Sequence, residues 1–402
     1  MLTAFFFSHP VLFPRIEFVY FLCHNGTMSV KVVFAGGGTG GHIYPGLAVC
    51  NELKTIARNN SIDLQIYWIG NSSGMDKEII EKSESADFFI PVPSGKLRRY
   101  FSLKNFSDIF KIAAAFFISF FKLLRIRPAL LFSKGGFVSV PPCIAAKLLG
   151  IPVYTHECDF TPGLATKINS RVASKILLSY EETKKFFPSS KQNSLVVCGN
   201  PVRRAFYESD AKKGLEFIFK NQNKPSKPVL FVCGGSLGAR QINSLVAQNL
   251  DWLCSHFYVV HQYGKANEDS VLLKNESYFP FPFIHSQICD VLACADFVVS
   301  RAGANSLWEA AVSCKPMVLI PLAGNGTRGD QIDNADYFEK KGCAVVLKGE
   351  VSSEEFKITL EKFLDSSYKE QMVENLKKFN SEKSNPAKFI AELIFNGSIK
   401  NT

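Results

Sequence analysis

The chain has 402 residues, of which 47% are hydrophobic and 20% are charged, so it can bury a sizeable core and extensive disorder is not expected. This length favours two domains, at roughly 100–200 residues for each. The eleven cysteines stand singly, without CxxC or another metal-like spacing. They indicate reduced thiols rather than a disulfide framework or a zinc site, and we expect no bound metal and no cofactor.

The formal net charge of +10 is concentrated in one stretch of the chain. Between Lys96 and Arg127 there are eight Lys or Arg residues and one acidic residue, Asp108, which makes a local net charge of +7. The same stretch contains seven Phe residues and Tyr100. Basic residues interleaved with aromatic ones suit an anionic membrane surface better than nucleic acid, so we expect no nucleic-acid partner.

Residues 1–27 are apolar, but prolines and charged residues such as Pro10 and Glu17 interrupt them. The segment lacks a basic start and a small-residue cleavage site, so it is a poor signal peptide, and the interruptions make it a poor membrane span. Met28 is followed by SVKVVFAGGGTGG, a normal opening for an α/β domain. We therefore expect translation to begin at Met28, with a hydrophobic anchor as the alternative.

Short apolar runs recur along the chain, each followed by a segment of helical length, and this alternation predicts βαβ units with parallel sheets. One series of expected strands covers residues 31–35, 65–69, 130–132, 152–155, 175–178 and 195–197, and a second covers 229–232, 258–262, 297–300, 317–320 and 344–347. The fold class is therefore α/β, with two Rossmann-like parallel-sheet domains that face a cleft. We expect domains over 28–207 and 228–380, a linker over 208–227, and a C-terminal helix and tail over 381–402.

The first expected strand runs into GGGTGGH, which ends at His42. A glycine-rich turn at a helix start exposes backbone N–H groups to an anion or a polar ligand. It is not a P-loop, since no Lys-Ser/Thr follows, and no acidic residue closes the next strand as a dinucleotide fingerprint requires. His42 would face the same cleft as a general base, with a structural hydrogen-bonding role as the alternative.

The second half repeats this arrangement with Gly234–Gly238 after a strand, which suggests a ligand gripped from both domains. Another helix start carries Asn305 and, within its first turns, Glu309, whose carboxylate can accept hydrogen bonds from two ribose hydroxyls. Charge complementarity at the helix N-terminus is the alternative for Glu309. Arg203, in CGNPVRR, could pair with a phosphate.

Several motifs, taken in this order and spacing, resemble the MurG family of glycosyltransferases: GGGTGGHIYPGLA, PSGKLRRY, SKGGFVSVPP, HECDFTPGLATKI, GNPVR, GGSLGARQIN, SRAGANSLWE and RGDQIDNA. The resemblance extends over nearly all of the chain from Met28. It implies the GT-B fold and transfer of N-acetylglucosamine from UDP-N-acetylglucosamine to the undecaprenyl-linked muramyl-pentapeptide of peptidoglycan synthesis. It also implies a peripheral location on the cytoplasmic face of the bacterial plasma membrane.

The resemblance further implies a set of substrate-binding residues. Thr39, Gly40 and Gly41 would contact both substrates. Ser236 and Arg203 would hold the diphosphate, Ile284 would present its backbone to the uracil, and Gln331 would bind the transferred sugar. The nucleoside would be wrapped by Ala304, Asn305, Ser306, Leu307, Trp308 and Glu309, with Glu309 on the ribose.

The chain departs from the family pattern at two positions. Asp159 stands where an amide is usual for a substrate-binding residue, and Asp330 stands where His or Gln is frequent. An α-linked donor and a β-linked product require an inverting reaction with a base for the acceptor 4-hydroxyl. His42 is the best candidate because its unperturbed pKa suits neutral pH, and Glu157 is a weaker one. No DxD pair occurs in the sequence, in keeping with a metal-independent reaction.

Residues 106–124 have apolar side chains at steps of three and four, which predicts an amphipathic helix. Lys111 and Lys122 bracket only ten uncharged residues, too few to span a bilayer. We expect this helix to dock on anionic lipid, and a core helix packed under the sheet is the alternative. The alternatives for the whole chain are a UDP-sugar transferase with a diacylglycerol acceptor, a UDP-sugar 2-epimerase, and a non-catalytic nucleotide-sugar-binding protein.

Overall fold

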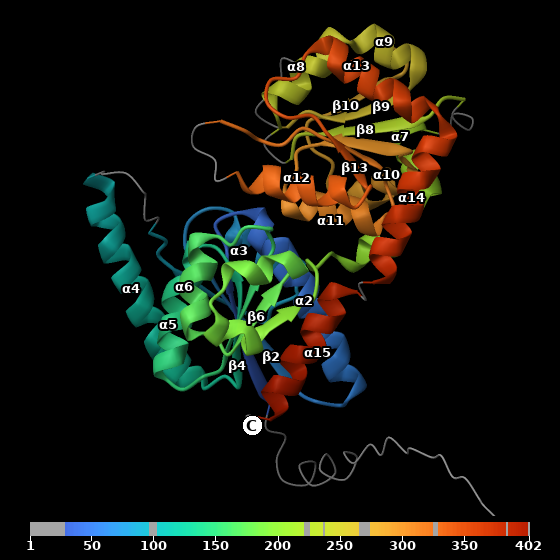
Figure 1. Ribbon diagram of the computed structural model, residues 1–402. Coiled ribbons are helices and arrows are strands. Elements are labelled where there is room, and N and C mark those ends of the chain that lie inside the picture. Colours follow the sequence, from blue (N-terminus) through green and yellow to red (C-terminus); the bar gives the residue numbers. More distant parts are fainter. Residues whose placement is uncertain are drawn as a thin grey trace, which may run out of the picture.

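The computed structural model describes residues 29–95, 103–220, 226–235, 238–264, 274–324, 329–382 and 385–400. The expected start at Met28, the segment before it and Ser236 lie outside these residues. Two α/β units are stacked on each other, and the C-terminal helix, in red, lies along the unit formed by the N-terminal half (Figure 1). This agrees with the expected two-domain α/β fold.

The N-terminal domain is built on a seven-stranded sheet of order β3-β2-β1-β4-β5-β6-β7, in which every neighbouring pair is parallel. Its strands are β1 (Val30–Gly36), β2 (Leu64–Asn71), β3 (Phe88–Val92), β4 (Leu130–Gly135), β5 (Val153–Glu157), β6 (Lys175–Leu178) and β7 (Leu195–Val197). The central strands are buried on both faces, as the apolar runs of the sequence predict.

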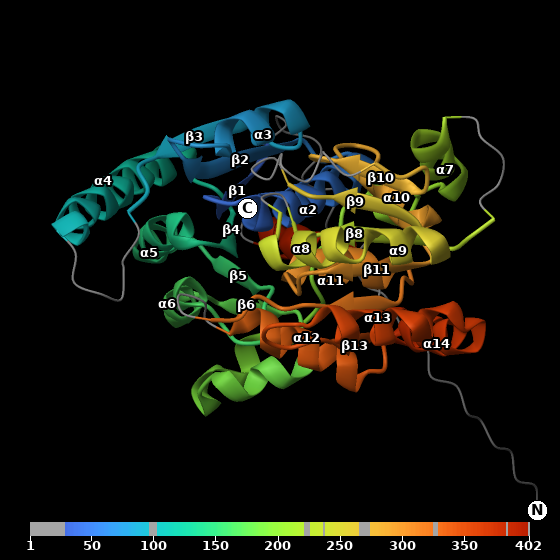
Figure 2. The ribbon, with the colours of Figure 1, turned by 90° about the horizontal axis from the view of Figure 1, so that it is seen from above.

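Helices cover both faces of this sheet. They are α2 (Gly40–Asn59), α3 (Asp76–Ser83), α4 (Leu103–Ile126), α5 (Val140–Leu148) and α6 (Leu164–Val172). In the view from above, α4, α5 and α6 lie on one side of the sheet and α2 lies on the other (Figure 2). Within the described residues, no helix is both long enough and apolar enough to cross a membrane.

The C-terminal domain has a six-stranded parallel sheet of order β10-β9-β8-β11-β12-β13. Its strands are β8 (Val229–Cys233), β9 (Tyr258–Gln262), β10 (Tyr278–Phe281), β11 (Phe297–Ser300), β12 (Met317–Leu319) and β13 (Ala344–Val346). Its helices are α7 (Ala211–Phe219), α8 (Arg240–Gln248), α9 (Leu250–His256), α10 (Ile288–Cys294), α11 (Ala304–Val312), α12 (Asp330–Lys340), α13 (Ser353–Glu361) and α14 (Ser366–Ser381). Helix α11 lies where this domain meets the N-terminal one (Figure 1).

The last helix, α15 (Pro386–Ile399), returns to the N-terminal domain. The Asn385 side chain caps it by accepting from two backbone N–H groups, and Pro386 occupies its first turn. Ile390 and Ile394 are buried in the same cluster as Leu47 of α2. The chain therefore crosses between the domains twice, once after β7 and once before α15.

The apolar runs of the sequence do not predict two of the strands, β3 and β10. Both are edge strands. Each contains a proline, Pro91 in β3 and Pro280 in β10. Proline cannot donate to a strand ladder and is tolerated at sheet edges, so these runs do not read as strands in the sequence. Part of the expected linker, 208–227, is also structured, because it contains α7, whose Gly214 packs closely on the Asp290 backbone of α10.

Candidate functional site

A cavity of about 470 Å³ lies between the two domains, at the carboxyl ends of strands from both sheets. This is the edge at which open α/β sheets bind their ligands. The sequence-predicted residues that line it are Thr39, Gly40, Gly41, Arg203, Ile284, Asn305, Ser306 and Glu309. Tyr44 and Gln262, which the sequence patterns did not single out, line it as well.

The first glycine turn is held by a buried carboxylate from α3. The Gly38 N–H lies 2.9 and 3.0 Å from the two carboxylate oxygens of Asp76, and the Asn71 N–H donates to the same group at 2.8 Å. A Cβ on Gly37 would overlap this carboxylate, and Gly38 has a φ of +83°, so both positions need glycine. Burial raises the pKa of Asp76. In the sequence, Asp76 is the acidic residue that ends GNSSGMD, and no motif links it to the glycine turn.

His42 does not line the cavity, but it follows Gly41, which does. Its half-buried imidazole packs on the glycine turn at the end of β4. A Cβ on Gly136 would lie 3.0 Å from His42 Cδ2, and one on Gly135 would lie 3.5 Å from His42 Nδ1. The second glycine turn of the N-terminal domain therefore makes room for the histidine ring.

Behind this ring, His156 at the end of β5 is buried. Its Nε2 donates to the Gly199 carbonyl at 2.9 Å, where the chain begins to cross to the other domain. Burial, and then the charge of Lys134 on the neighbouring strand, lower its pKa well below the usual value. His156 is therefore a neutral structural residue, and it leaves His42 as the candidate base in this part of the site.

Glu157, the weaker candidate base, holds a loop together. Its two carboxylate oxygens accept from the Asp159 N–H at 3.0 Å and the Gly163 N–H at 2.9 Å. The ligand atoms of Glu157, Cys158 and Asp159 lie within 4.8 Å of one another, but the backbone already engages both oxygens of the glutamate. We therefore assign neither a base nor a metal to this cluster.

The residues expected to hold the ribose and a phosphate are paired with each other. Arg203, in the segment that joins the domains, lies 3.3 Å from the Glu309 carboxylate of α11. The guanidinium also lies over the rings of Phe206 and Tyr44, at 4.9 and 5.2 Å from their centroids. Burial raises the pKa of Glu309, and the Arg203 charge opposes that rise. Glu309 is therefore held at the cavity wall by a partner that a ligand could replace.

Gln262, at the end of β9, organises the opposite wall. Its Oε1 accepts from the Ile284 N–H at 2.9 Å, and its Nε2 donates to the Gly235 carbonyl at 3.4 Å. This glutamine therefore fixes the position of Ile284 relative to the second glycine turn. It ends a short strand and belongs to no motif, so no sequence pattern predicts its role.

The remaining expected residues lie outside the cavity lining. Ala304, Leu307 and Trp308 are buried, and the Trp308 Nε1–H donates to the Tyr180 hydroxyl at 3.1 Å. Gln331 accepts from the Leu322 N–H at 2.9 Å, at the start of α12.

Asp159 takes part in a contact between the domains. Its carboxylate accepts from Asn334 Nδ2 at 3.1 Å, and Asn334 Oδ1 in turn accepts from the Phe160 N–H at 2.8 Å. An aspartate at this position therefore serves as an acceptor for the C-terminal domain.

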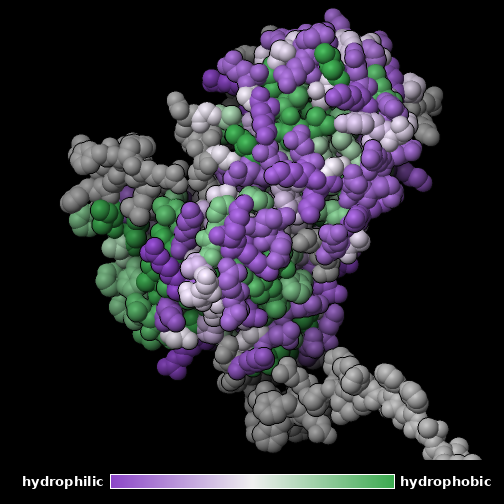
Figure 3. Space-filling view, viewed as in Figure 1, coloured by the Kyte–Doolittle hydropathy of each residue, from purple (hydrophilic) through white to green (hydrophobic). Residues whose placement is uncertain are grey.

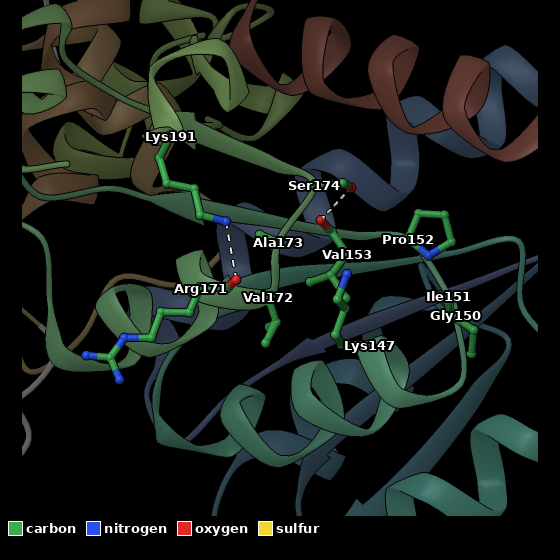
Figure 4. Close-up of a pocket in the computed structure, with 10 residues that line it drawn as sticks. All are labelled: Lys147, Gly150, Ile151, Pro152, Val153, Arg171, Val172, Ala173, Ser174 and Lys191. Atoms are coloured by element: carbon green, nitrogen blue, oxygen red, sulfur yellow. Dashed lines mark hydrogen bonds between the residues drawn. The ribbon is translucent and has the colours of Figure 1, made fainter. Parts of the chain in front are cut away.

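A smaller cavity of about 230 Å³ lies at the amino ends of β5 and β6, at the edge of the N-terminal sheet opposite the interdomain cavity. Figure 4 shows Lys191 reaching the Arg171 carbonyl, at 3.2 Å, while the Arg171 guanidinium points away. None of the sequence-predicted site residues lines this cavity.

Comparison with known proteins identifies the family. Residues 32–178 match the glycosyltransferase family 28 N-terminal domain, and residues 229–394 match the C-terminal domain of the same family. A Treponema denticola protein named UDP-N-acetylglucosamine–N-acetylmuramyl-(pentapeptide) pyrophosphoryl-undecaprenol N-acetylglucosamine transferase is 53% identical over 336 residues, which are 79% of this chain and 84% of the relative.

Solved structures share the fold. The crystal structure of Acinetobacter baumannii MurG superimposes with a TM-score of 0.69 at 23% identity, covering 90% of this chain and 99% of that one. A UDP-GlcNAc 2-epimerase from Neisseria meningitidis, bound to UDP-GlcNAc, has a TM-score of 0.64 at 15% identity and covers 93% of this chain and 100% of that one. The fold alone thus accommodates both transferases and epimerases. The matches to both family 28 domains and the 53% identity to the Treponema relative establish that the chain belongs to the MurG family within glycosyltransferase family 28.

Proposed function

We propose that this chain transfers N-acetylglucosamine from UDP-N-acetylglucosamine to the 4-hydroxyl of an undecaprenyl-linked muramyl-pentapeptide. The observation that carries the proposal is the interdomain cavity, in which the first glycine turn faces the nucleotide-binding residues of α11. The named activity of relatives with about half of their residues identical supports the same substrates.

The donor fits the C-terminal wall of the cavity. The Ile284 N–H donates to Gln262, so the uracil would meet the Ile284 carbonyl. The ribose hydroxyls would donate to Glu309 and displace Arg203, whose guanidinium would then turn to the diphosphate. The glycine turn at Gly234–Gly238, with Ser236, would face the same diphosphate.

The chemistry is an inverting displacement. His42 accepts the proton of the acceptor 4-hydroxyl while that oxygen bonds to the anomeric carbon of the donor sugar. The bond between this carbon and the diphosphate oxygen breaks, and its electron pair leaves with UDP. Arg203 and backbone N–H groups offset the charge that develops on the diphosphate.

The lipid-linked acceptor requires contact with a membrane, and α4 offers a surface for it. Its outer face exposes Phe110, Phe117, Phe121 and Leu124, between 49% and 63% of each side chain. Hydrophobic residues gather along α4 and α5 at this edge of the N-terminal domain (Figure 3). Lys122 and Arg125 flank the stripe and are also exposed. This combination suits insertion into an anionic interface.

The inner face of α4 is at the same time part of the core. Ala115, Leu123 and Ile126 are buried in the cluster under the sheet, so this face has the core role that was the alternative expectation for the helix. We therefore propose peripheral attachment through the outer face, on the cytoplasmic side of the plasma membrane, as the family resemblance implies.

One assay tests the reaction against its alternatives. The purified chain is incubated with UDP-N-acetylglucosamine and an analogue of the undecaprenyl-linked muramyl-pentapeptide, called here the lipid I analogue. Released UDP and the disaccharide product are measured. We expect UDP release only with the acceptor present and a β-1,4-linked product. Product formed on diacylglycerol, or formation of the 2-epimer without any acceptor, would overturn the proposal.

A further inference from the structure

The side chain of Asn305, in the first turn of α11, bridges the two domains. Its Nδ2 donates to the Gly41 carbonyl at 3.1 Å, and its Oδ1 accepts from Asn200 Nδ2 at 3.0 Å. Asn200 is fully buried in the segment that joins the domains. Because Asn200 donates to the oxygen of the Asn305 amide, the nitrogen of that amide is directed at Gly41.

Pro45 explains why the Gly41 carbonyl is open to a partner from the other domain. In an α-helix the carbonyl of residue 41 accepts from the N–H of residue 45, and proline has no N–H. Pro45 lies inside α2, so the helix cannot supply this donor. The missing bond falls on the residue directly before His42, and the Asn305 amide provides a replacement.

The same face of α11 belongs to the nucleotide site. Asn305 and Glu309 are four residues apart, so their side chains are neighbours on the helix surface, and both line the cavity. Glu309 contacts Arg203 at the wall of this cavity. A ligand that draws Glu309 to a ribose therefore acts on the helix that also holds the first turn of α2.

We propose that Asn305 is a positioning residue, whose amide ties the nucleotide-binding helix α11 to the first turn of α2 and so sets His42 against the donor sugar. This inference rests on the proposed transfer reaction. It assigns the Asn305 side chain to the contact between domains rather than to the nucleoside, and it accounts for a proline inside α2.

The first test separates positioning from binding in the full-length chain. In Asn305→Ala we expect kcat with the lipid I analogue to fall by about 10- to 100-fold, the range that a small misplacement produces. The calorimetric Kd for UDP-N-acetylglucosamine should change by less than about threefold. Asn375→Ala is the matched control, because it removes a similar amide-to-carbonyl bond, 2.9 Å to Gly342, outside the cleft. The control should keep kcat within about twofold.

The second test uses the proline. Pro45→Ala restores an N–H that can bond to the Gly41 carbonyl within α2 and so compete with Asn305. We expect a lower kcat together with an unchanged or higher melting temperature, since alanine favours the helix. A merely structural role would not separate these two readouts. The double variant Pro45→Ala/Asn305→Ala should lose no more kcat than the more impaired single variant.

Three results would overturn the positioning role: equal losses of affinity and kcat in Asn305→Ala, wild-type kcat in Pro45→Ala, or additive losses in the double variant. Turnover of the wild-type chain with the lipid I analogue is measured first. Its absence would overturn the proposed function and the inference with it, whereas wild-type turnover with unaffected variants would overturn the inference alone.

Discussion

Asp76 of α3 holds Gly38 of the first glycine turn in place, with both carboxylate oxygens within 3.0 Å of the Gly38 N–H. The contact joins residues 38 positions apart and fixes the turn that faces the cavity. This contact orients the N–H groups of the turn before a ligand binds, so binding does not have to include the cost of ordering the turn.

Replacing this carboxylate should impair both stability and turnover. In Asp76→Asn the amide can accept fewer of the three bonds, and we expect a loss of about 1–3 kcal/mol in the free energy of unfolding and at least about tenfold in kcat/KM. Asp87→Asn is the control, since Asp87 also accepts a backbone N–H in this domain, from Ile66, but lies away from the turn. Equal effects of the two variants on kcat/KM would contradict a specific role for Asp76.

Removing the candidate base should separate turnover from donor affinity. His42→Ala should lower kcat by about 10²–10⁴-fold, the usual contribution of a general base. The Kd for UDP-N-acetylglucosamine should change little, because the imidazole packs on Gly135 and Gly136 rather than lining the cavity. Steady-state kinetics and calorimetry measure the two quantities. Near-normal turnover in this variant would remove His42 from the mechanism.

The ribose contact of Glu309 can be tested with a modified donor. The wild-type chain should discriminate against a 2′-deoxyuridine analogue of the donor by about 1–3 kcal/mol, which is about 5- to 150-fold in kcat/KM. Glu309→Gln should bind the natural donor more weakly and lose most of that discrimination. If the variant still discriminates as the wild type does, a residue other than Glu309 contacts the ribose hydroxyls.

Two buried histidines predict how stability depends on pH. Burial lowers the pKa of His261 to about 4, and burial together with Lys134 lowers the pKa of His156. The unfolded chain takes up protons on these groups below about pH 6.5, and the folded chain does not. The free energy of unfolding should therefore fall as the pH drops from 6.5 towards 4, by about 1.4 kcal/mol per pH unit for each neutral histidine.

Urea unfolding at several pH values measures this slope. His261→Gln keeps polar atoms near Tyr278 and Asn243 but no longer titrates, so the slope should decrease by about one histidine's share. The comparison uses slopes and not absolute stabilities, so an overall destabilisation of the variant does not affect it. An unchanged slope would show that His261 takes up a proton equally in both states.

Membrane attachment through α4 should depend on its exposed aromatic residues. Phe117→Asp combined with Phe121→Asp places two carboxylates on the outer face, and we expect the chain no longer to float with anionic vesicles. Ile358→Asp, at a comparably exposed position on α13 of the other domain, is the control and should still float. Flotation of the double variant, with its fold intact by circular dichroism, would reject this docking surface.

Much of the architecture was predictable because its signals are local. Eleven of the thirteen strands lie in apolar runs that the sequence shows directly, and helices follow them in regular alternation. The two missed strands, β3 and β10, contain Pro91 and Pro280, and only a sheet edge tolerates these. The glycine turns were predictable for the same reason, because a glycine cluster at the end of a strand is typical of a tight turn or of a backbone that a ligand approaches closely.

By itself the sequence determined the two parallel-sheet domains, the glycine turns at their carboxyl edges and the family to which the motifs belong. Only the tertiary structure decided which side chains support those turns: Asp76 on Gly38, Gln262 on Ile284, and Asn305 on Gly41. Each of these contacts joins residues between 22 and 264 positions apart. Periodicity describes a residue's neighbours along one helix or strand, whereas these hydrogen bonds depend on how separate elements pack. That packing is within one domain for Asp76 and Gln262 and between the two domains for Asn305.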